Sequence, residues 1–210
     1  MKPFLPALLT GLVLASTTVF GAAATPKTAA PAAPVIPATP RAETIDLESR
    51  GRIVLVLPAG WTVVREDPDN ALDLTLKAPS GVNAMARFTF GFPAEGNFET
   101  AADVRTRATE LGEDQVDSSV EKRVVLQTYK LRSGYGYYSS YTDPKLVGKK
   151  PVPGDFKYIT VGVFRPAPGI VGIVSILCDD LAGPEYKQLQ QVVETLELLG
   201  PGGARRKTEF

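Results

Sequence analysis

The residue types best suited to binding chemistry lie together in "GYGYYSSYTDP", residues 134–144, and in the loop after it. Four of the seven tyrosines of the chain fall in this stretch. Alternate side chains of a strand share a face, so three of these tyrosines line one side of a predicted strand, together with Asp143. The following loop adds lysines, and tyrosines beside lysines suit a sugar, a peptide or an anionic group. The candidate ligand-binding residues are Tyr137, Tyr141, Asp143 and Lys150.

The same stretch has a purely structural interpretation. Opposite the tyrosine face lies a side rich in glycine and hydroxyl groups, against which another element can pack closely. In this interpretation the tyrosines pack under a helix and keep their hydroxyl groups at the wet edge. If a helix covers Tyr135, Tyr137 and Tyr141, the ligand-binding hypothesis loses its motivation.

Much familiar catalytic and metal chemistry is excluded by composition. The chain has no histidine, which removes the usual general base near neutral pH and the commonest transition-metal ligand. Cys178 is the only cysteine, so neither an intrachain disulfide nor a cysteine metal cage can form. It falls in an apolar run, which favours a buried structural thiol. We therefore expect no enzyme, no cofactor and no metal.

Asp179 and Asp180 form a carboxylate pair at the end of a predicted strand. A calcium ion requires about six to eight oxygen ligands, and adjacent aspartates on a continuing strand point apart. We instead expect a turn whose carboxylates help to cap a helix that opens at Pro184.

Trp61, which follows a Pro-Ala-Gly turn, is expected to plug the end of the core.

The charge balance bears on the class of partner. The chain carries 23 basic and 23 acidic residues, for a formal net charge of zero. Proteins that bind nucleic acid by its phosphates present an excess of positive charge. Nucleic acid is therefore not an expected partner.

The N-terminus indicates export. Lys2, the apolar stretch 4–20 and small residues at 21–24 are typical of a secretory signal peptide, which we assign to residues 1–21. An uncleaved signal anchor is the alternative, because the apolar stretch is at the short limit for a membrane span. We expect the mature protein in the periplasm or outside the cell, with no later membrane span.

The rest of the chain divides by composition into three parts. Residues 22–40 are dominated by alanine, proline and threonine, which predicts an extended linker. Residues 41–200 have the patterns of one folded domain, and we expect residues 201–210 to form a disordered tail.

Within the domain, hydrophobic periodicity predicts strands, then a helix, then more strands and a final helix. The first helix is expected after an N-cap at Thr100 and to end at Gly112, and the second to run from Pro184 to Gly200. Residues 169–179 are apolar on both faces, which predicts a central strand covered on both sides. The other expected strands are 53–57, which we also predict to be covered on both faces, 61–64, 71–79, 84–93, 120–132, 134–144 and 155–164. This order predicts an α+β fold with one antiparallel sheet and helices packed on it.

These segments resemble the PsbP-like family. The resemblance rests on a strand ending in "LPAGW", a mid-chain helix, a meander of long strands and an amphipathic C-terminal helix, over about residues 53–199. "GYYSSYTDP", "PGDFKYITVGVF" and "IVSILCDD" also resemble segments of uncharacterised exported bacterial proteins. The family implies an antiparallel sheet sandwiched between helices, an α/β/α arrangement. Its members perform unrelated tasks, so it implies no single function. Nothing here resembles the metal-binding histidines of its photosynthetic members.

Two functional hypotheses follow. The first is an exported, non-enzymatic protein that binds an envelope protein or component through its sheet domain. The alternative is a small-ligand binding protein, for a sugar or an anion, that uses the tyrosine-rich strand and the lysine loop.

Overall fold

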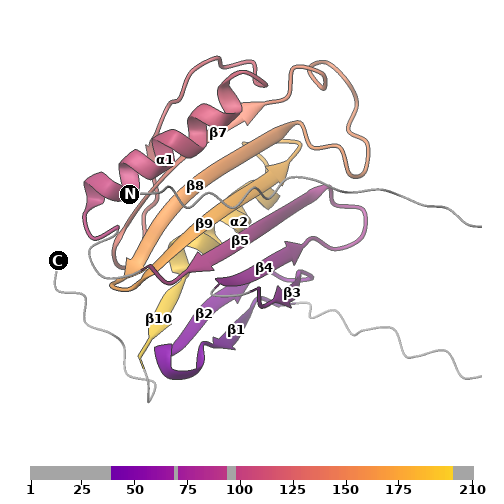
Figure 1. Cartoon of the computed structure of the whole chain (residues 1–210). Coiled ribbons are helices and arrows are strands. Elements are labelled where there is room, and N and C mark those ends of the chain that lie inside the picture. Colours follow the sequence, from indigo (N-terminus) through magenta and orange to yellow (C-terminus); the bar gives the residue numbers. More distant parts are fainter. Residues whose placement is uncertain (1–38, 69–70, 94–97, 201–210) are drawn as a thin grey trace, which may run out of the picture. The chain divides into compact units, whose positions relative to one another are not determined.

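A seven-stranded antiparallel sheet is the largest element of the protein, whose computed structural model describes residues 39–68, 71–93 and 98–200 (Figure 1). The strand order is β3-β4-β5-β9-β8-β7-β6, so β9 is central. The pattern of two apolar faces in residues 169–179 predicted this position. The strands are β3 (Thr62–Glu66), β4 (Ala71–Lys77), β5 (Ala84–Gly91), β6 (Gln127–Thr128), β7 (Tyr135–Thr142), β8 (Tyr158–Ala167) and β9 (Ile170–Cys178).

The described residues belong to one compact unit of the chain, residues 35–210. The predicted signal peptide, the linker as far as residue 38 and the predicted tail lie outside the described residues. Within the described part, no helix has the length and apolar character needed to cross a membrane.

Alternation of side chains decides which face of each strand is buried. Leu72, Leu74 and Leu76 of β4 are all buried, whereas Lys77 is exposed. In β5, Phe88 and Phe90 point to the same side and meet Phe164 of β8 edge-on. This side of the sheet therefore carries the main hydrophobic core.

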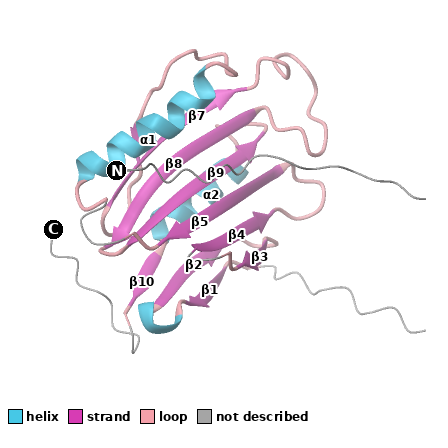
Figure 2. Cartoon of the chain, viewed as in Figure 1, coloured by secondary structure: helices cyan, strands magenta, loops and turns pink. Residues whose placement is uncertain are grey.

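Two helices lie on opposite faces of this sheet (Figure 2). α1 (Ala101–Val116) contacts β7 and β8, while α2 (Pro184–Thr195) contacts β5 and β9 on the core side. The predicted α+β class, with an antiparallel sheet between helices, is confirmed.

A second, three-stranded antiparallel sheet was not predicted. It consists of β1 (Arg41–Asp46), β2 (Arg52–Leu57) and β10 (Glu197–Leu199), in the order β1-β2-β10. α2 packs against β2 as well as against the large sheet, and so lies between the two sheets. The prediction that residues 53–57 are covered on both faces is wrong, since Val56 is 39% exposed.

The end of the last helix also differs from the prediction. α2 stops at Thr195, and Leu196 already has an extended ψ of 132°. Residues 197–199 form β10, which pairs with β2. Hydrophobic periodicity alone cannot distinguish a short apolar strand from the last turn of a helix. Residues 197–199 form a strand because β2, which is remote in sequence, pairs with them.

Trp61 plugs the core as predicted. It is 1% exposed, and its Nε1 donates a hydrogen bond to Gln188 Oε1 of α2 over 3.3 Å.

The strand expected over residues 120–132 is reduced to the two residues of β6, and Val120 and Val125 are each 50% exposed. Val120 and Val125 therefore lack the cover that a longer strand would give them, whereas Tyr129 of the same segment is 3% exposed and packs in the main core.

α1 begins as predicted and ends later. Thr100 Oγ1 accepts a hydrogen bond from the Asp103 backbone N–H, and the Asp103 carboxylate accepts one from the Thr100 N–H, which forms a capping box. The helix continues past Gly112 to Val116, so the predicted end at Gly112 is wrong. Gly112 is buried, and a Cβ there would lie 2.5 Å from the Tyr141 Oη. Its small size permits close packing of the helix on β7.

We predict that Gly112→Ala destabilises the protein by roughly 1–3 kcal/mol through overpacking, even though alanine favours a helix by about 1 kcal/mol. Removal of the hydroxyl by Tyr141→Phe should reduce this cost, because the added methyl group then has more room. Equilibrium urea unfolding of both single variants and the double variant measures the coupling. An equal cost of Gly112→Ala in both backgrounds would contradict this account of the contact.

Candidate binding site

The tyrosine face of β7 is covered by α1. Tyr141 is 1% exposed, and Tyr135 and Tyr137 are partly buried beside the cluster that contains Val104 and Ala108 of the helix. Alternate residues of β7 do share this face, as predicted, but the surface that they form is an internal one. Tyr137 and Tyr141 therefore pack in the helix–sheet interface.

The hydroxyl groups of Tyr135 and Tyr141 form hydrogen bonds within the protein. Ser139 Oγ donates a hydrogen bond to the Tyr141 Oη over 2.9 Å, and burial raises the pKa of Tyr141 above its ordinary value. Tyr135 donates to the backbone oxygen of Glu99 at the start of α1. The tyrosines thus help to fix the helix on the sheet.

The other two predicted residues lie beyond the end of β7, away from the covered tyrosine rings. Asp143 is partly buried, and its Oδ1 accepts a hydrogen bond from the Lys145 backbone N–H over 2.7 Å. Lys150 is exposed further along the β7–β8 loop. The structure therefore does not bring Tyr137, Tyr141, Asp143 and Lys150 into one accessible site.

Asp143 does line a groove that sequence patterns did not predict. The groove has a volume of about 560 Å³ and lies where the end of α1, the β7–β8 loop and the sheet meet. Its apolar lining includes Phe156, Ile159 and Leu177. Ile159 and Leu177 are partners in the β8–β9 register, which places both on the same face of the sheet as α1.

Charged groups of both signs border this groove, which we call the β7-end groove. Asp117 comes from the residues just after α1, and Asp143 and Lys145 from the end of β7. Lys157 lies next to β8, with its Nζ 5.1 Å from the centroid of the Tyr158 ring. An apolar lining with charges of both signs at its border suits a ligand with apolar and polar parts better than a polyanion.

A hydrogen-bond network centred on Asn83 holds one wall of the groove. Asn83 Nδ2 donates to the Asp155 backbone oxygen and to Asp179 Oδ2, each over 2.8 Å, and Asn83 Oδ1 accepts from the Gly154 N–H over 3.0 Å. Asp179 Oδ1 in turn accepts from the Lys157 N–H over 3.3 Å. The β7–β8 loop is therefore tied to the β4–β5 turn.

This network explains the carboxylate pair. Asp179 fixes the loop, and Asp180 Oδ1 accepts from the Ala182 N–H in the turn before α2. The predicted helix cap is wrong, because Gly183 is the N-cap residue and the described residues give it no side-chain cap. Within the described ranges, no three His, Cys, Asp or Glu side chains are grouped to hold a metal ion. Asn83 was not predicted from the sequence, because the residues around it indicate only a turn.

Glu121 supports the opposite wall. It accepts hydrogen bonds from the Thr142 backbone N–H over 2.9 Å and from the Thr142 Oγ1 over 2.6 Å. Partial burial acts to raise the pKa of Glu121, but the two hydrogen bonds from Thr142 outweigh it, so the pKa lies below its ordinary value. Because Thr142 lines the groove, its hydrogen bonds with Glu121 help to hold the shape of the groove.

Cys178 takes no part in an exposed site. It is 2% exposed at the end of β9, and burial raises the pKa of its thiol to about 11. The side chain is thus a neutral thiol near pH 7.

Comparisons with known proteins leave the family open. No protein-family model matches the chain, and a search of curated proteins finds no match. A crystal structure from Bacteroides thetaiotaomicron VPI-5482 is similar over 71% of this chain, with 18% sequence identity and a TM-score of 0.42. The similar region covers 46% of that chain, so this chain matches less than half of its length. Membership of the PsbP-like family stays a prediction.

We predict that Asn83→Ala loosens the β7–β8 loop. Trypsin cleavage after the exposed Lys149 should become several-fold faster, since local opening of the loop controls access of the protease, whereas the Lys150–Pro151 bond resists trypsin. Peptide mapping during limited digestion measures this, with Thr106→Ala on the exposed side of α1 as the control. Equal cleavage rates for Asn83→Ala and the native chain would show that the network does not hold the loop.

We predict that Glu121 contributes stability that depends on pH. Its folded-state pKa is lowered, so the contribution is complete above about pH 4.5 and is lost as the pH falls through the folded pKa. Glu121→Gln should therefore cost about 1 kcal/mol at pH 7 and less in acid. Urea unfolding from neutral to acidic pH tests this, with the exposed Glu66→Gln as the control. A cost of Glu121→Gln that is the same at every pH would contradict the assignment.

Proposed function

We propose that the protein is an exported, non-enzymatic binding protein whose β7-end groove holds a segment of an envelope protein. The groove is the observation that carries this proposal. Its volume of about 560 Å³ falls within the range of roughly 300–1,000 Å³ typical of binding pockets. The signal-peptide pattern of residues 1–21 supports export, and the linker pattern of residues 22–40 supports a domain that an extended segment sets apart from the N-terminus of the mature chain.

The chemistry of the groove favours a polypeptide partner. Phe156, Ile159 and Leu177 offer apolar contact, and Asp143 and Lys157 offer one charge of each sign. A peptide segment with an apolar side chain between polar or charged ones matches both features. The anchored β7–β8 loop supports the proposal further, because a wall that is already ordered loses little conformational entropy on binding.

Binding rather than catalysis is proposed because the groove lacks an activated nucleophile. Ser118 Oγ donates its hydrogen bond to the Gln115 backbone oxygen over 3.1 Å, and Thr142 Oγ1 donates to Glu121 from the groove wall. The partner of the Ser118 hydroxyl is a backbone oxygen, which does not act as a base, and the lowered pKa of the Glu121 carboxylate makes it a weak base for the Thr142 hydroxyl.

A small anionic or sugar ligand in the same groove is the second candidate. Lys145 and Lys157 both line it, and two ammonium groups suit an anion. The tyrosines of the original ligand hypothesis no longer support this candidate, since α1 covers them.

Position-specific photo-crosslinking in cells that produce the full chain tests the proposal. A photoreactive residue at Ser118 or Lys145, both exposed at the groove, should give the same discrete protein adduct. The same probe at Thr106, exposed on α1, is the matched control and should not give it. Lys145→Glu combined with Lys157→Glu should reduce the adduct from Ser118 several-fold.

Two outcomes would overturn the proposal. One is a set of adducts at Thr106 identical to that at the groove, which would indicate contact by chance. The other is no discrete protein adduct from either groove position. In that case, a small molecule that co-purifies with the chain and is lost in the double lysine variant would favour the second candidate.

A further inference from the structure

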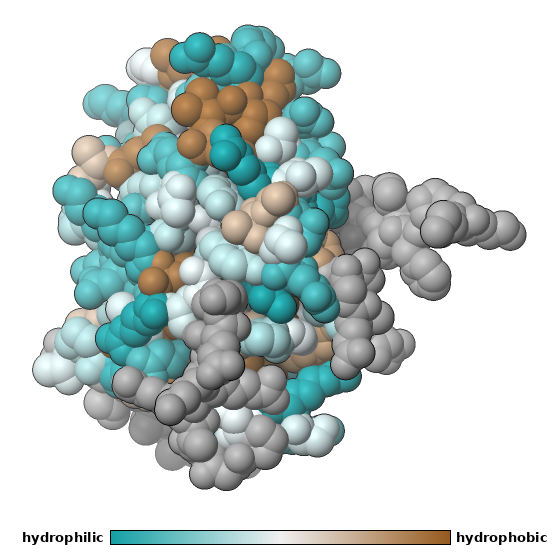
Figure 3. Space-filling model, turned by 90° about the vertical axis from the view of Figure 1, so that its left-hand side faces the viewer, coloured by the Kyte–Doolittle hydropathy of each residue, from teal (hydrophilic) through white to brown (hydrophobic). Residues whose placement is uncertain are grey.

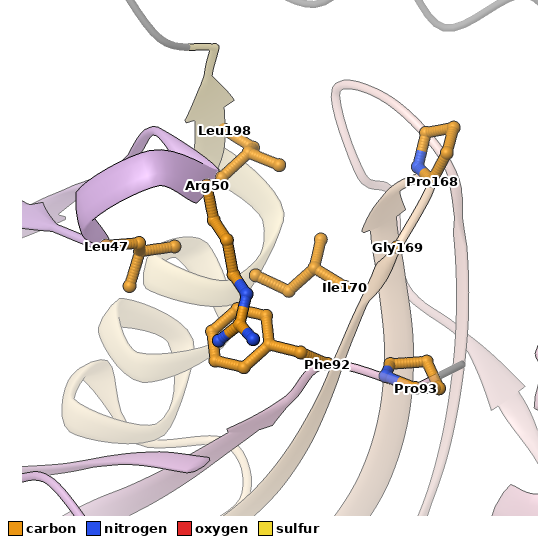
Figure 4. Close-up of a pocket in the computed structure, with 8 residues that line it drawn as sticks. All are labelled: Leu47, Arg50, Phe92, Pro93, Pro168, Gly169, Ile170 and Leu198. Carbon is orange, nitrogen blue, oxygen red and sulfur yellow. The ribbon is translucent and has the colours of Figure 1, made fainter. Parts of the chain in front are cut away.

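A second pocket, which Figure 4 shows in close-up, lies at the opposite end of the large sheet from the β7-end groove. The groove is lined by Leu177 near the end of β9, whereas this pocket is lined by Ile170 at the start of β9. It has a volume of about 210 Å³, room for a group the size of several water molecules. Leu47 and Leu198 bring the three-stranded sheet and its β1–β2 connection to its wall. The pocket is thus formed where two sheets meet.

The lining is apolar apart from one cation. Leu47, Ile170 and Leu198 point into the pocket, and Pro93 and Pro168 close its far side (Figure 4). None of the described lining residues is acidic. This side of the protein is otherwise mostly hydrophilic, with separate hydrophobic areas (Figure 3).

Arg50 supplies the cation. Its guanidinium lies over the Phe92 ring, with Cζ 4.1 Å from the ring centroid (Figure 4). The stacked ring covers one face of the planar group and limits its orientation, while the N–H donors of a guanidinium lie along its edge. Arginine has five such N–H donors, so Arg50 can donate to a further partner even when some of its donors already have one.

The backbone that carries Arg50 is held in an unfavourable conformation. Glu48 has a φ of 57°, in the left-handed region that non-glycine residues rarely adopt. Gly51 has a φ of 105°, and a Cβ there would lie 2.1 Å from the Leu199 backbone oxygen of β10. The Leu47 N–H donates to the Gly51 oxygen over 2.8 Å and closes the loop. Strained backbone that its surroundings hold in place is found preferentially at binding sites.

We propose that this pocket binds a small apolar carboxylate. The carboxylate accepts a hydrogen bond from the edge of the Arg50 guanidinium, and the hydrocarbon part lies against Leu47, Ile170 and Leu198. The volume suits a short or medium chain or one ring. This site is separate from the β7-end groove, so it stands independently of the proposed partner protein.

Calorimetric titration of the full mature chain with octanoate tests this proposal. We expect saturable binding with a Kd of about 1 mM or tighter. Octanol lacks the charge and acetate lacks the tail, so each should bind at least tenfold more weakly. Arg50→Gln should weaken octanoate binding by about tenfold, and Arg50→Lys by less, because lysine keeps the charge but lacks the planar fork. Arg105→Gln, at an exposed position of α1, should bind octanoate as the native chain does.

Thermal unfolding of each variant measures whether it is folded. We expect every variant to be folded, because Arg50 and Arg105 are both exposed. Three results would overturn the proposal: no saturable binding of octanoate, equal binding of octanol or acetate, or unchanged binding by Arg50→Gln. Failure of the β7-end groove to form protein adducts would leave this proposal untouched, since the two sites share no lining residue.

Discussion

The burial of α2 between the two sheets is the interaction on which the rest of the structure depends. Leu189 and Val193 are fully buried, and the helix contacts β2 on one side and β5 and β9 on the other. Each such side chain contributes roughly 1.5–3 kcal/mol by leaving water. The three-stranded sheet has only β10, β2 and β1, and it needs this helix to cover its apolar face. Without α2, neither the small sheet nor the pocket at its edge would form.

A polar network within this interface fixes how α2 is oriented. Tyr186 of α2 accepts a hydrogen bond from Thr160 of β8 over 3.0 Å and another from Gln190 Nε2 over 2.8 Å. Burial raises the pKa of Tyr186, which keeps its hydroxyl neutral. Apolar contact alone tolerates small sliding movements, whereas buried polar groups must meet their partners. The helix is thereby held in one register on the sheet.

The β7-end groove lies on the face of the sheet that α1 covers, and the Arg50 pocket lies at the other end of the sheet, on its core side. α1 covers β7 and β8, including the tyrosine face, and then ends at Val116. The β7-end groove begins where the helix stops covering the sheet. The pocket beside Arg50 lies at the other end, where the strained β1–β2 connection meets the turn between β8 and β9. Both sites are therefore at ends of elements, and loops rather than strand centres supply most of their polar groups.

Several local features were determined by sequence alone. The alternation in β4, the apolar faces of β9, the capping box at Thr100 and the start of α2 at Pro184 each depend on residues close together in the chain. Sequence also placed Asp143 beside lysines of the following loop. These predictions succeeded because strand alternation, capping and proline geometry are short-range effects.

Tertiary structure decided the rest. Residues 197–199 became a strand because β2 lies beside them. Gly112 lies inside α1, where its small size lets the helix pack closely on Tyr141. Asn83 accepts a hydrogen bond from Gly154, which is 71 positions away, and Arg50 lies over the ring of Phe92, which is 42 positions away. Whether the tyrosines faced a ligand or a helix depended on where α1 docked. Contacts of this kind depend on which elements meet in space, and the hydrophobic pattern of one segment does not contain that information.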